Sequence, residues 1–136
     1  MVYITRKFHF SASHRLYKPG LTDEENARIF GDCSNPNGHG HNYIIEVTVS
    51  GNPNPDVGYI MDLKLLKNIV DEALIKKVDH KNLNCDVDFL KGIIPTSENL
   101  VMCFWEVIRS KIENAERKLF SIKLFETENN YVEFKG

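Results

Sequence analysis

Two histidines at alternate positions, at the head of a β-branched segment, constrain this chain more than any other feature. The odd positions that follow His39 and His41 are apolar: Tyr43, Ile45, Val47 and Val49. Successive side chains of a strand point to opposite faces, so both imidazoles share this apolar face and can bind one cation. The segment predicts a strand that begins in a metal site.

A second predicted strand, near the N-terminus, carries a third histidine. Its apolar face is interrupted only by Arg6 and ends at His14; it contains Val2, Ile4, Phe8, Phe10 and Ala12. If the two strands pair antiparallel, three imidazoles meet at one end of the ribbon. Three imidazoles with a fourth position open are typical of catalytic Zn²⁺, although copper, nickel and iron(II) also accept imidazole.

Composition limits the classes of function. The chain has 136 residues, 42% of them hydrophobic, which predicts one domain spanning residues 1–136. A net charge of -2 with interspersed signs argues against nucleic-acid binding, and no apolar run is long enough to cross a bilayer. Three cysteines, an odd number without CxxC pairs, favour reduced thiols and a cytoplasmic protein.

Helix signals occupy the middle of the chain. Thr22 and Glu25 have capping-box spacing, which predicts a short helix or turn after them. Asp62 caps a predicted amphipathic helix that runs toward Val78, and Thr96 or Ser97 caps a second one.

Strand signals return at the C-terminal end. Phe120, Ile122 and Leu124 alternate on one face, and a turn at residues 128–130 leads to a last short strand. The order ββααββ predicts an α+β fold, a four-stranded antiparallel sheet with two helices on one face.

Two further positions carry chemistry. Asp79 and His80 lie in a predicted loop, where they could activate the Cys33 thiol if the fold brings them together; a surface ion pair or a capping Asp is the alternative. Glu126 extends the face of Ile122 and Leu124. A carboxylate there suits the N–H edge of a pterin or guanine, unless the strand ends first and Glu126 is solvated.

Five ordered motifs together resemble the 6-pyruvoyltetrahydropterin synthase family, in its eukaryotic type. They are FSASHRL at 10–16, CSNPNGHGHNY at 33–43, VDHKNLN at 78–84, PTSEN at 95–99 and FETENN at 125–130. The resemblance spans nearly the whole chain. Five residues separate Cys33 from His39, whereas the related 6-carboxytetrahydropterin synthases typically have a shorter interval.

The resemblance implies a role for each motif. Zn²⁺ would be held by the three histidines already named, His14, His39 and His41. Cys33 would be the proton-abstracting base, activated by Asp79 with His80, and Glu126 would anchor the pterin. The segment near the pterin would contain Thr96, Ser97 and Glu98, and the basic residues that could meet a triphosphate are Arg15, Lys18, Arg28 and Lys81.

The resemblance also implies a reaction and an assembly. The expected enzyme is a zinc-dependent lyase of tetrahydrobiopterin biosynthesis, which converts 7,8-dihydroneopterin triphosphate to 6-pyruvoyltetrahydropterin and triphosphate. The expected assembly is a homohexamer, a dimer of trimers whose T-fold-like sheets join into a barrel. Two alternatives stay open: a 6-carboxytetrahydropterin synthase, and a zinc- or pterin-binding protein of the same fold without turnover.

Overall fold

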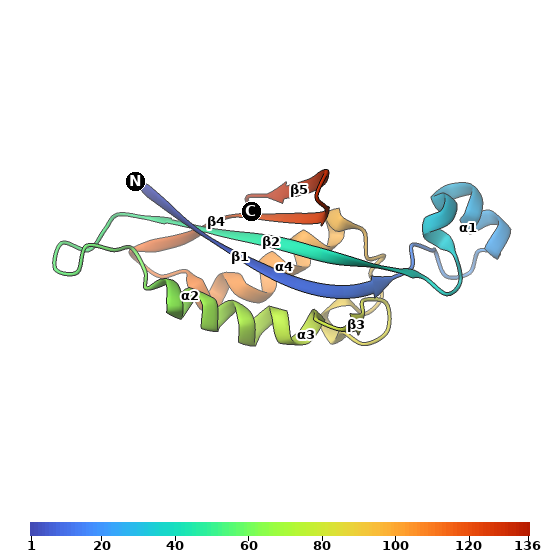
Figure 1. Ribbon diagram of the computed structural model, residues 1–136, viewed down its shortest axis with the longest axis horizontal. Coiled ribbons are helices and arrows are strands. Elements are labelled where there is room, and N and C mark those ends of the chain that lie inside the picture. Colours follow the sequence, from blue (N-terminus) through green and yellow to red (C-terminus); the bar gives the residue numbers. More distant parts are fainter.

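The computed structural model describes all residues 1–136 as a twisted sheet with helices on one face (Figure 1). The strands are β1 (Val2–His14), β2 (His39–Gly51), β3 (Lys81–Asn82), β4 (Arg117–Thr127) and β5 (Asn130–Phe134). The helices are α1 (Asp23–Phe30), α2 (Leu63–Val70), α3 (Lys76–Val78) and α4 (Ser97–Ile112). Short 3-10 turns lie at Gly31–Ser34 and Asp88–Leu90, and a π-helical turn at Asp71–Ile75 joins α2 to α3.

The sheet has five strands in the order β3-β1-β2-β4-β5, so the predicted number of four is wrong. The four long strands pair antiparallel as predicted, but β3 adds a two-residue parallel bridge to Ala12 and Ser13 of β1. Two residues are too few to show the alternation by which a strand is recognised in sequence. The bridge forms because the chain that leaves α3 passes along the free edge of β1.

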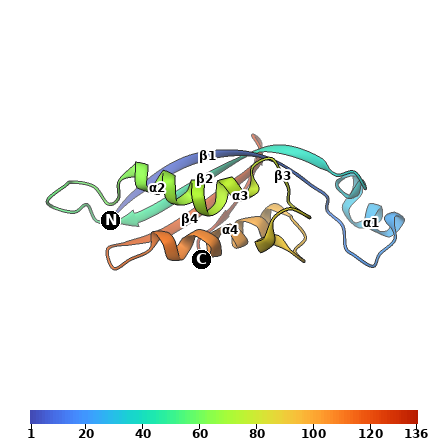
Figure 2. The same cartoon turned by 90° about the horizontal axis from the view of Figure 1, so that it is seen from below.

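The helices begin where the capping residues predict. Thr22 and Glu25 form a reciprocal capping box, and Asp62 accepts the backbone N–H of Lys64 at 2.8 Å. The helix predicted from Asp62 to Val78 is present but interrupted by the π-helical turn. Figure 2 shows α2, α3 and α4 crossing the same face of the sheet, while α1 projects from one end of the molecule.

The core lies between this helical layer and the sheet. Phe10 stacks on Tyr43 of the neighbouring strand, with ring centroids 4.7 Å apart, and Phe104 of α4 meets Phe10 edge-on. Fully burying a side chain of this size stabilises the fold by roughly 2–3 kcal/mol. The apolar faces of β1 and β2 therefore hold the helices, and the histidines lie at the end of those same faces.

One predicted position on β4 is wrong. Phe120 was expected on the face of Ile122 and Leu124, but a β-bulge shifts the pairing so that Val49 opposes Leu119 while Thr48 opposes Ser121. Leu119 takes the core position. Phe120 lies on the other face and packs against Tyr3, with ring centroids 4.6 Å apart. A bulge inserts one residue and reverses the alternation on one side of it. Glu126 lies beyond this bulge, where the β4–β5 pairing shifts again between Phe125 and Thr127, and its carboxylate still faces His41.

None of the helices combines the length and apolarity that a membrane span requires.

Candidate metal centre

Three histidines converge at one end of the β1–β2 ribbon. His39 is directly opposite His14, and His41 is opposite Ala12, so the strand register places the three imidazoles side by side. One nitrogen from each ring lies within 4.8 Å of the other two, and the Nε2 atoms of His14 and His39 are 3.1 Å apart. The antiparallel pairing assumed from the sequence is therefore the pairing that assembles the cluster.

The nitrogen atoms of this cluster fit a divalent metal ion. His14 Nδ1 donates to the carbonyl of Pro95 at 2.8 Å, which leaves the lone pair of its Nε2 facing the other rings. His41 Nε2 is buried without a hydrogen bond. Ligand atoms of a tetrahedral zinc site lie about 3.4 Å apart, close to the observed spacing of His14 and His39. These residues can hold a metal ion.

Electrostatics favour neutral imidazoles in the cluster. Burial lowers the pKa of His14, and the adjacent His39 lowers it further, although the hydrogen bond to Pro95 works in the opposite direction. Burial also lowers the pKa of His41, against the attraction of the Glu126 carboxylate. A neutral ring keeps the lone pair that a metal ion needs.

The Glu126 carboxylate faces this cluster from the neighbouring strand β4. Its Oε1 lies 3.4 Å from His41 Nε2, and its Oε2 accepts a hydrogen bond from Ser97 Oγ at 2.9 Å. The strand continues to Thr127, so it does not end before this residue. Of the two interpretations left open by the sequence, the structure selects the one that turns Glu126 toward the histidines.

A cavity of about 250 Å³ adjoins the cluster through Glu126, which contacts His41. Its lining includes Glu126 together with Thr96, Ser97 and Glu98 from the start of α4. The remaining walls come from the chain after β1 and from β5: Leu16, Asn130, Tyr131 and Val132. Glu126 thus belongs to the lining of this cavity and also contacts His41 of the histidine cluster.

Asp79 and His80 lie at the other edge of the ribbon, against β1. Asp79 Oδ1 contacts His80 Nδ1 at 3.0 Å and accepts the backbone N–H of Ser11 at 2.9 Å. That N–H bond is the main cause that lowers the pKa of Asp79, and His80 adds to it. His80 has a φ of 59°, which is rare for a residue other than glycine, and its backbone N–H donates to the Ser11 carbonyl.

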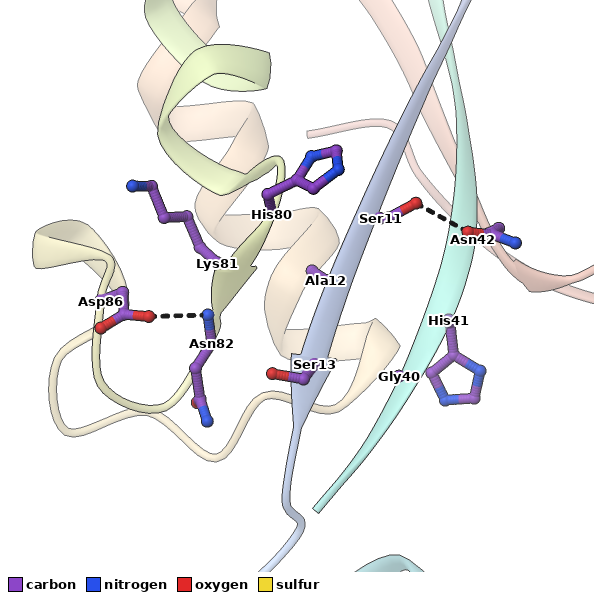
Figure 3. A pocket seen from close by; sticks show the side chains of 10 residues that line it. All are labelled: Ser11, Ala12, Ser13, Gly40, His41, Asn42, His80, Lys81, Asn82 and Asp86. Carbon is purple, nitrogen blue, oxygen red and sulfur yellow. Dashed lines mark hydrogen bonds between the residues drawn. The ribbon is translucent and has the colours of Figure 1, made fainter. Parts of the chain in front are cut away.

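The His80 side chain opens onto a second hollow, which His41 also lines from β2 (Figure 3). Figure 3 shows it above Lys81 on one side of β1, while the Ser11 hydroxyl of β1 reaches Asn42 on the other side. The ring is 82% exposed. In the single chain, His80 is thus a solvent-exposed residue at the rim of a polar hollow.

Cys33 occupies a third place. It lies half-buried in the 3-10 turn that follows α1, where its carbonyl accepts the backbone N–H of Leu16 at 2.9 Å. No hydrogen bond joins its thiol to His80. The structure therefore brings together the histidines, Glu126 and the segment 96–98, but does not join Cys33, Asp79 and His80 within one chain.

Arg15, one of the four basic candidates, is committed to its own chain. It donates to the Ser34 carbonyl at 2.7 Å, pairs with Asp23 at 3.1 Å and stacks over the Tyr17 ring. These contacts anchor the loop that carries Cys33.

Two participants were not singled out from the sequence. The Pro95 carbonyl orients His14, and nothing in the sequence signals a backbone acceptor from so distant a segment. Tyr43 is fully buried with its hydroxyl 3.4 Å from His14 Nδ1 and its ring edge-on to His41, and burial raises its pKa. Its position two residues after His41, on the same face, was the available signal.

The fold and the site together define a class: an α+β protein with three histidines that can hold a metal ion, next to a carboxylate that lines a cavity. The family profile described as 6-pyruvoyl tetrahydropterin synthase matches residues 3–136. The chain is 45% identical to 6-pyruvoyl tetrahydrobiopterin synthase of Pongo abelii over 133 residues, which covers 98% of this chain and 90% of the relative.

Other comparisons agree. The solved 6-pyruvoyl tetrahydropterin synthase of Caenorhabditis elegans superposes with a TM-score of 0.91 at 39% identity, covering 99% of this chain and 95% of that one. The 6-carboxy-5,6,7,8-tetrahydropterin synthase of Aquifex aeolicus is 28% identical, covering 97% of this chain and 96% of the relative. The chain belongs to the 6-pyruvoyl tetrahydropterin synthase family.

Proposed function

We propose that this chain is a zinc-dependent lyase that converts 7,8-dihydroneopterin triphosphate to 6-pyruvoyltetrahydropterin and triphosphate. The observation that carries the proposal is the cluster of His14, His39 and His41 beside the cavity that holds Glu126. Names of relatives at 45% and 39% identity support the same reaction. The lower identity to a 6-carboxytetrahydropterin synthase, 28%, favours the pyruvoyl product over the carboxy product.

The histidines and Glu126 divide substrate binding between them. Zinc on the three imidazoles supplies Lewis acidity toward the side-chain oxygens of the substrate. Glu126 accepts N–H bonds from the 2-amino group and N3 of the pterin ring, which places the side chain next to the imidazoles. Thr96, Ser97 and Glu98 form the wall of the same cavity.

Proton transfer falls to Cys33 and to the pair Asp79 and His80. His80 takes the proton of the Cys33 thiol, the resulting thiolate takes a proton from the substrate side chain, and the protonated His80 returns one as hydrogens move from side chain to ring. Asp79 holds His80 Nδ1 at 3.0 Å, so that Nε2 remains available for this exchange. Loss of triphosphate and internal transfer of hydrogens need no external redox cofactor.

A second copy of the chain completes the site in this proposal. His80 is exposed at a sheet edge and makes no bond to Cys33 of its own chain. This is the arrangement expected if the Asp79–His80 pair of one copy acts on Cys33 of a neighbouring copy. Joining sheets edge to edge into the barrel of a trimer, and two trimers into a homohexamer, also covers unpaired strand edges. Three free cysteines are compatible with a cytoplasmic setting.

The test is incubation of the purified, zinc-loaded chain with 7,8-dihydroneopterin triphosphate. The expected result is release of triphosphate with a product of the mass of 6-pyruvoyltetrahydropterin. A 6-carboxy product with acetaldehyde would move the chain to the carboxytetrahydropterin branch. Absence of triphosphate release from protein of full zinc content would reject catalysis and favour a binding protein.

A further inference from the structure

Thr96 and Ser97 perform two different tasks, although both adjoin one cavity. Thr96 Oγ1 accepts the backbone N–H of Asn99 at 3.3 Å and so caps α4. Asn99 in turn donates from its side chain to the Ile94 carbonyl at 2.9 Å. These two bonds lock the turn before α4 independently of any ligand, and they commit the Thr96 hydroxyl to the helix.

Ser97 directs its hydroxyl away from the helix, to Glu126. Ser97 Oγ donates to Glu126 Oε2 at 2.9 Å, a contact between residues 29 positions apart, on α4 and β4. An ionised carboxylate only accepts hydrogen bonds, so the single hydroxyl proton of Ser97 is committed to this bond. A charge-assisted bond of this kind is stronger than a bond between neutral groups.

The bond fixes how the carboxylate is turned. Glu126 Oε1 lies 3.4 Å from His41 Nε2, the nitrogen that is buried without a hydrogen bond and is available to a metal ion. That nitrogen has one lone pair, so a metal ion bound there leaves no hydrogen bond to hold Oε1. Ser97 is then the side chain that holds Glu126, and it holds it from a turn that is already locked.

We propose that Ser97 is a positioning residue that sets the plane of the Glu126 carboxylate for two parallel N–H bonds, and thereby selects pteridines with a 2-amino group. The proposal rests on the proposed function, because it takes the ligand to be a pterin. Two parallel bonds need both oxygens in the plane of the ring, so rotation of a freed carboxylate weakens them together. Ser97 contributes through Glu126 and needs no contact with the ligand.

The experiment measures binding of two fluorescent probes to the zinc-loaded full-length protein. Unsubstituted pterin carries the 2-amino group, and lumazine has a carbonyl at that position, which a carboxylate repels. We expect the wild-type chain to prefer pterin, and Ser97→Ala to weaken pterin binding about fivefold while lumazine binding is unchanged. Ser97→Thr, which keeps a hydroxyl, should recover most of the preference.

A double-mutant cycle separates positioning from a general structural effect. In a Glu126→Ala background, Ser97→Ala should have no further effect on pterin binding, because the group that it orients is gone. Thr5→Ala, which removes one partner of the exposed hydroxyl pair of Thr5 and Thr48, is the matched control and should leave both probes unaffected. Zinc content should stay the same in every variant.

The outcomes distinguish the inference from the proposed function. If pterin binds and Glu126→Ala weakens it, but Ser97→Ala has no effect or acts equally in both backgrounds, the positioning role is wrong and the proposed function stands. Equal loss of pterin and lumazine on Ser97→Ala would also overturn it. A wild-type chain that binds neither probe would overturn both.

Discussion

The β1–β2 ribbon carries two groups of titratable residues that differ in burial, one at its end and the other at its β3 edge. At the metal end, His14 is 1% exposed and is held by the Pro95 carbonyl and by the rings of two neighbouring histidines. At the β3 edge, the His80 side chain is 82% exposed and is held by Asp79 and by a turn bonded to Ser11. The three imidazoles of the first group come together within one chain, whereas the second group presents its imidazole outward.

The difference separates binding from chemistry. Groups that bind a metal ion and recognise a ring must be in place before the ligand arrives, so they belong in a buried, cross-braced region. An acid–base group that serves another copy has to be exposed in the isolated chain. Under the proposed function, the histidine cluster binds the metal ion, and the Asp79–His80 pair at the β3 edge completes the site of a neighbouring copy.

The largest effect should come from the metal end. His14→Ala removes a buried ligand, and we expect loss of bound zinc and a fall in triphosphate release of about a thousandfold. Elemental analysis and a triphosphate assay measure the two effects. His9→Ala is the control for metal content, because His9 lies on the same strand with its side chain on the opposite face. Full zinc content in His14→Ala would break the assignment of the metal centre.

The β3 edge should show a smaller effect of a different kind. His80→Ala should lower the rate about a hundredfold while zinc content and pterin affinity stay unchanged, because the imidazole transfers protons and does not bind. The rate constant, the metal content and the affinity for pterin are each measured on the same preparation. Loss of zinc in His80→Ala would contradict the separation of the two edges.

Mixing two inactive variants tests whether the edges of different chains cooperate. If Cys33 and His80 act in one site from different chains, co-assembled Cys33→Ala and His80→Ala should restore about a quarter of the sites, by random pairing of subunits. The measurement is triphosphate release after unfolding and refolding the mixture. If both groups came from one chain, every site would lack one of them and activity would stay at the level of the separate variants.

Backbone packing at the metal end should be less tolerant than elsewhere. Gly38 has a φ of 71°, and an added Cβ would lie 2.8 Å from the His14 carbonyl oxygen. Gly38→Ala should cost about 2 kcal/mol in the free energy of unfolding and weaken zinc binding, because it pushes the His39 strand away from His14. Gly20→Ala has a similarly positive φ with nothing within 4 Å, so it isolates the steric clash. If chemical denaturation shows the same loss of stability for Gly38→Ala and Gly20→Ala, backbone strain and not the steric clash accounts for it.

The smallest effect should be the pH dependence of stability without metal. Burial lowers the pKa of His14 and His41 below 6.5, so below that pH the unfolded chain binds more protons and stability falls. The thermal midpoint of metal-free protein should drop by about 3 °C between pH 7 and 5. Asp79, whose pKa is lowered from 3.8, stabilises the fold above that value and loses its contribution only in stronger acid. In a His14→Gln, His41→Gln double variant, the thermal midpoint should change less between pH 7 and 5. If it changes as much as in the wild type, groups other than these two histidines cause the loss of stability.

Side-chain positions could be predicted from the sequence where the alternation of apolar residues extends over a whole strand. One alternating segment ends at His14 and another begins at His39, and together they predict which face the imidazoles share. Antiparallel pairing of the two strands then brings the imidazoles together. The side of Glu126 could be anticipated in the same way. Phe120 could not, because a bulge is a local insertion in pairing that leaves no mark on a short apolar run.

By itself, the amino-acid sequence determined the elements that alternate or cap: the long strands, the helix caps at Asp62 and at Thr96 or Ser97, and the shared face of the histidines. Those features arise from interactions between neighbours along the chain, which periodicity records. Only the tertiary structure decided that the Pro95 carbonyl orients His14, that Ser97 holds Glu126, and that His80 turns outward from the edge of β1. These contacts join residues far apart in sequence through single hydrogen bonds, and a single bond has no periodicity to read.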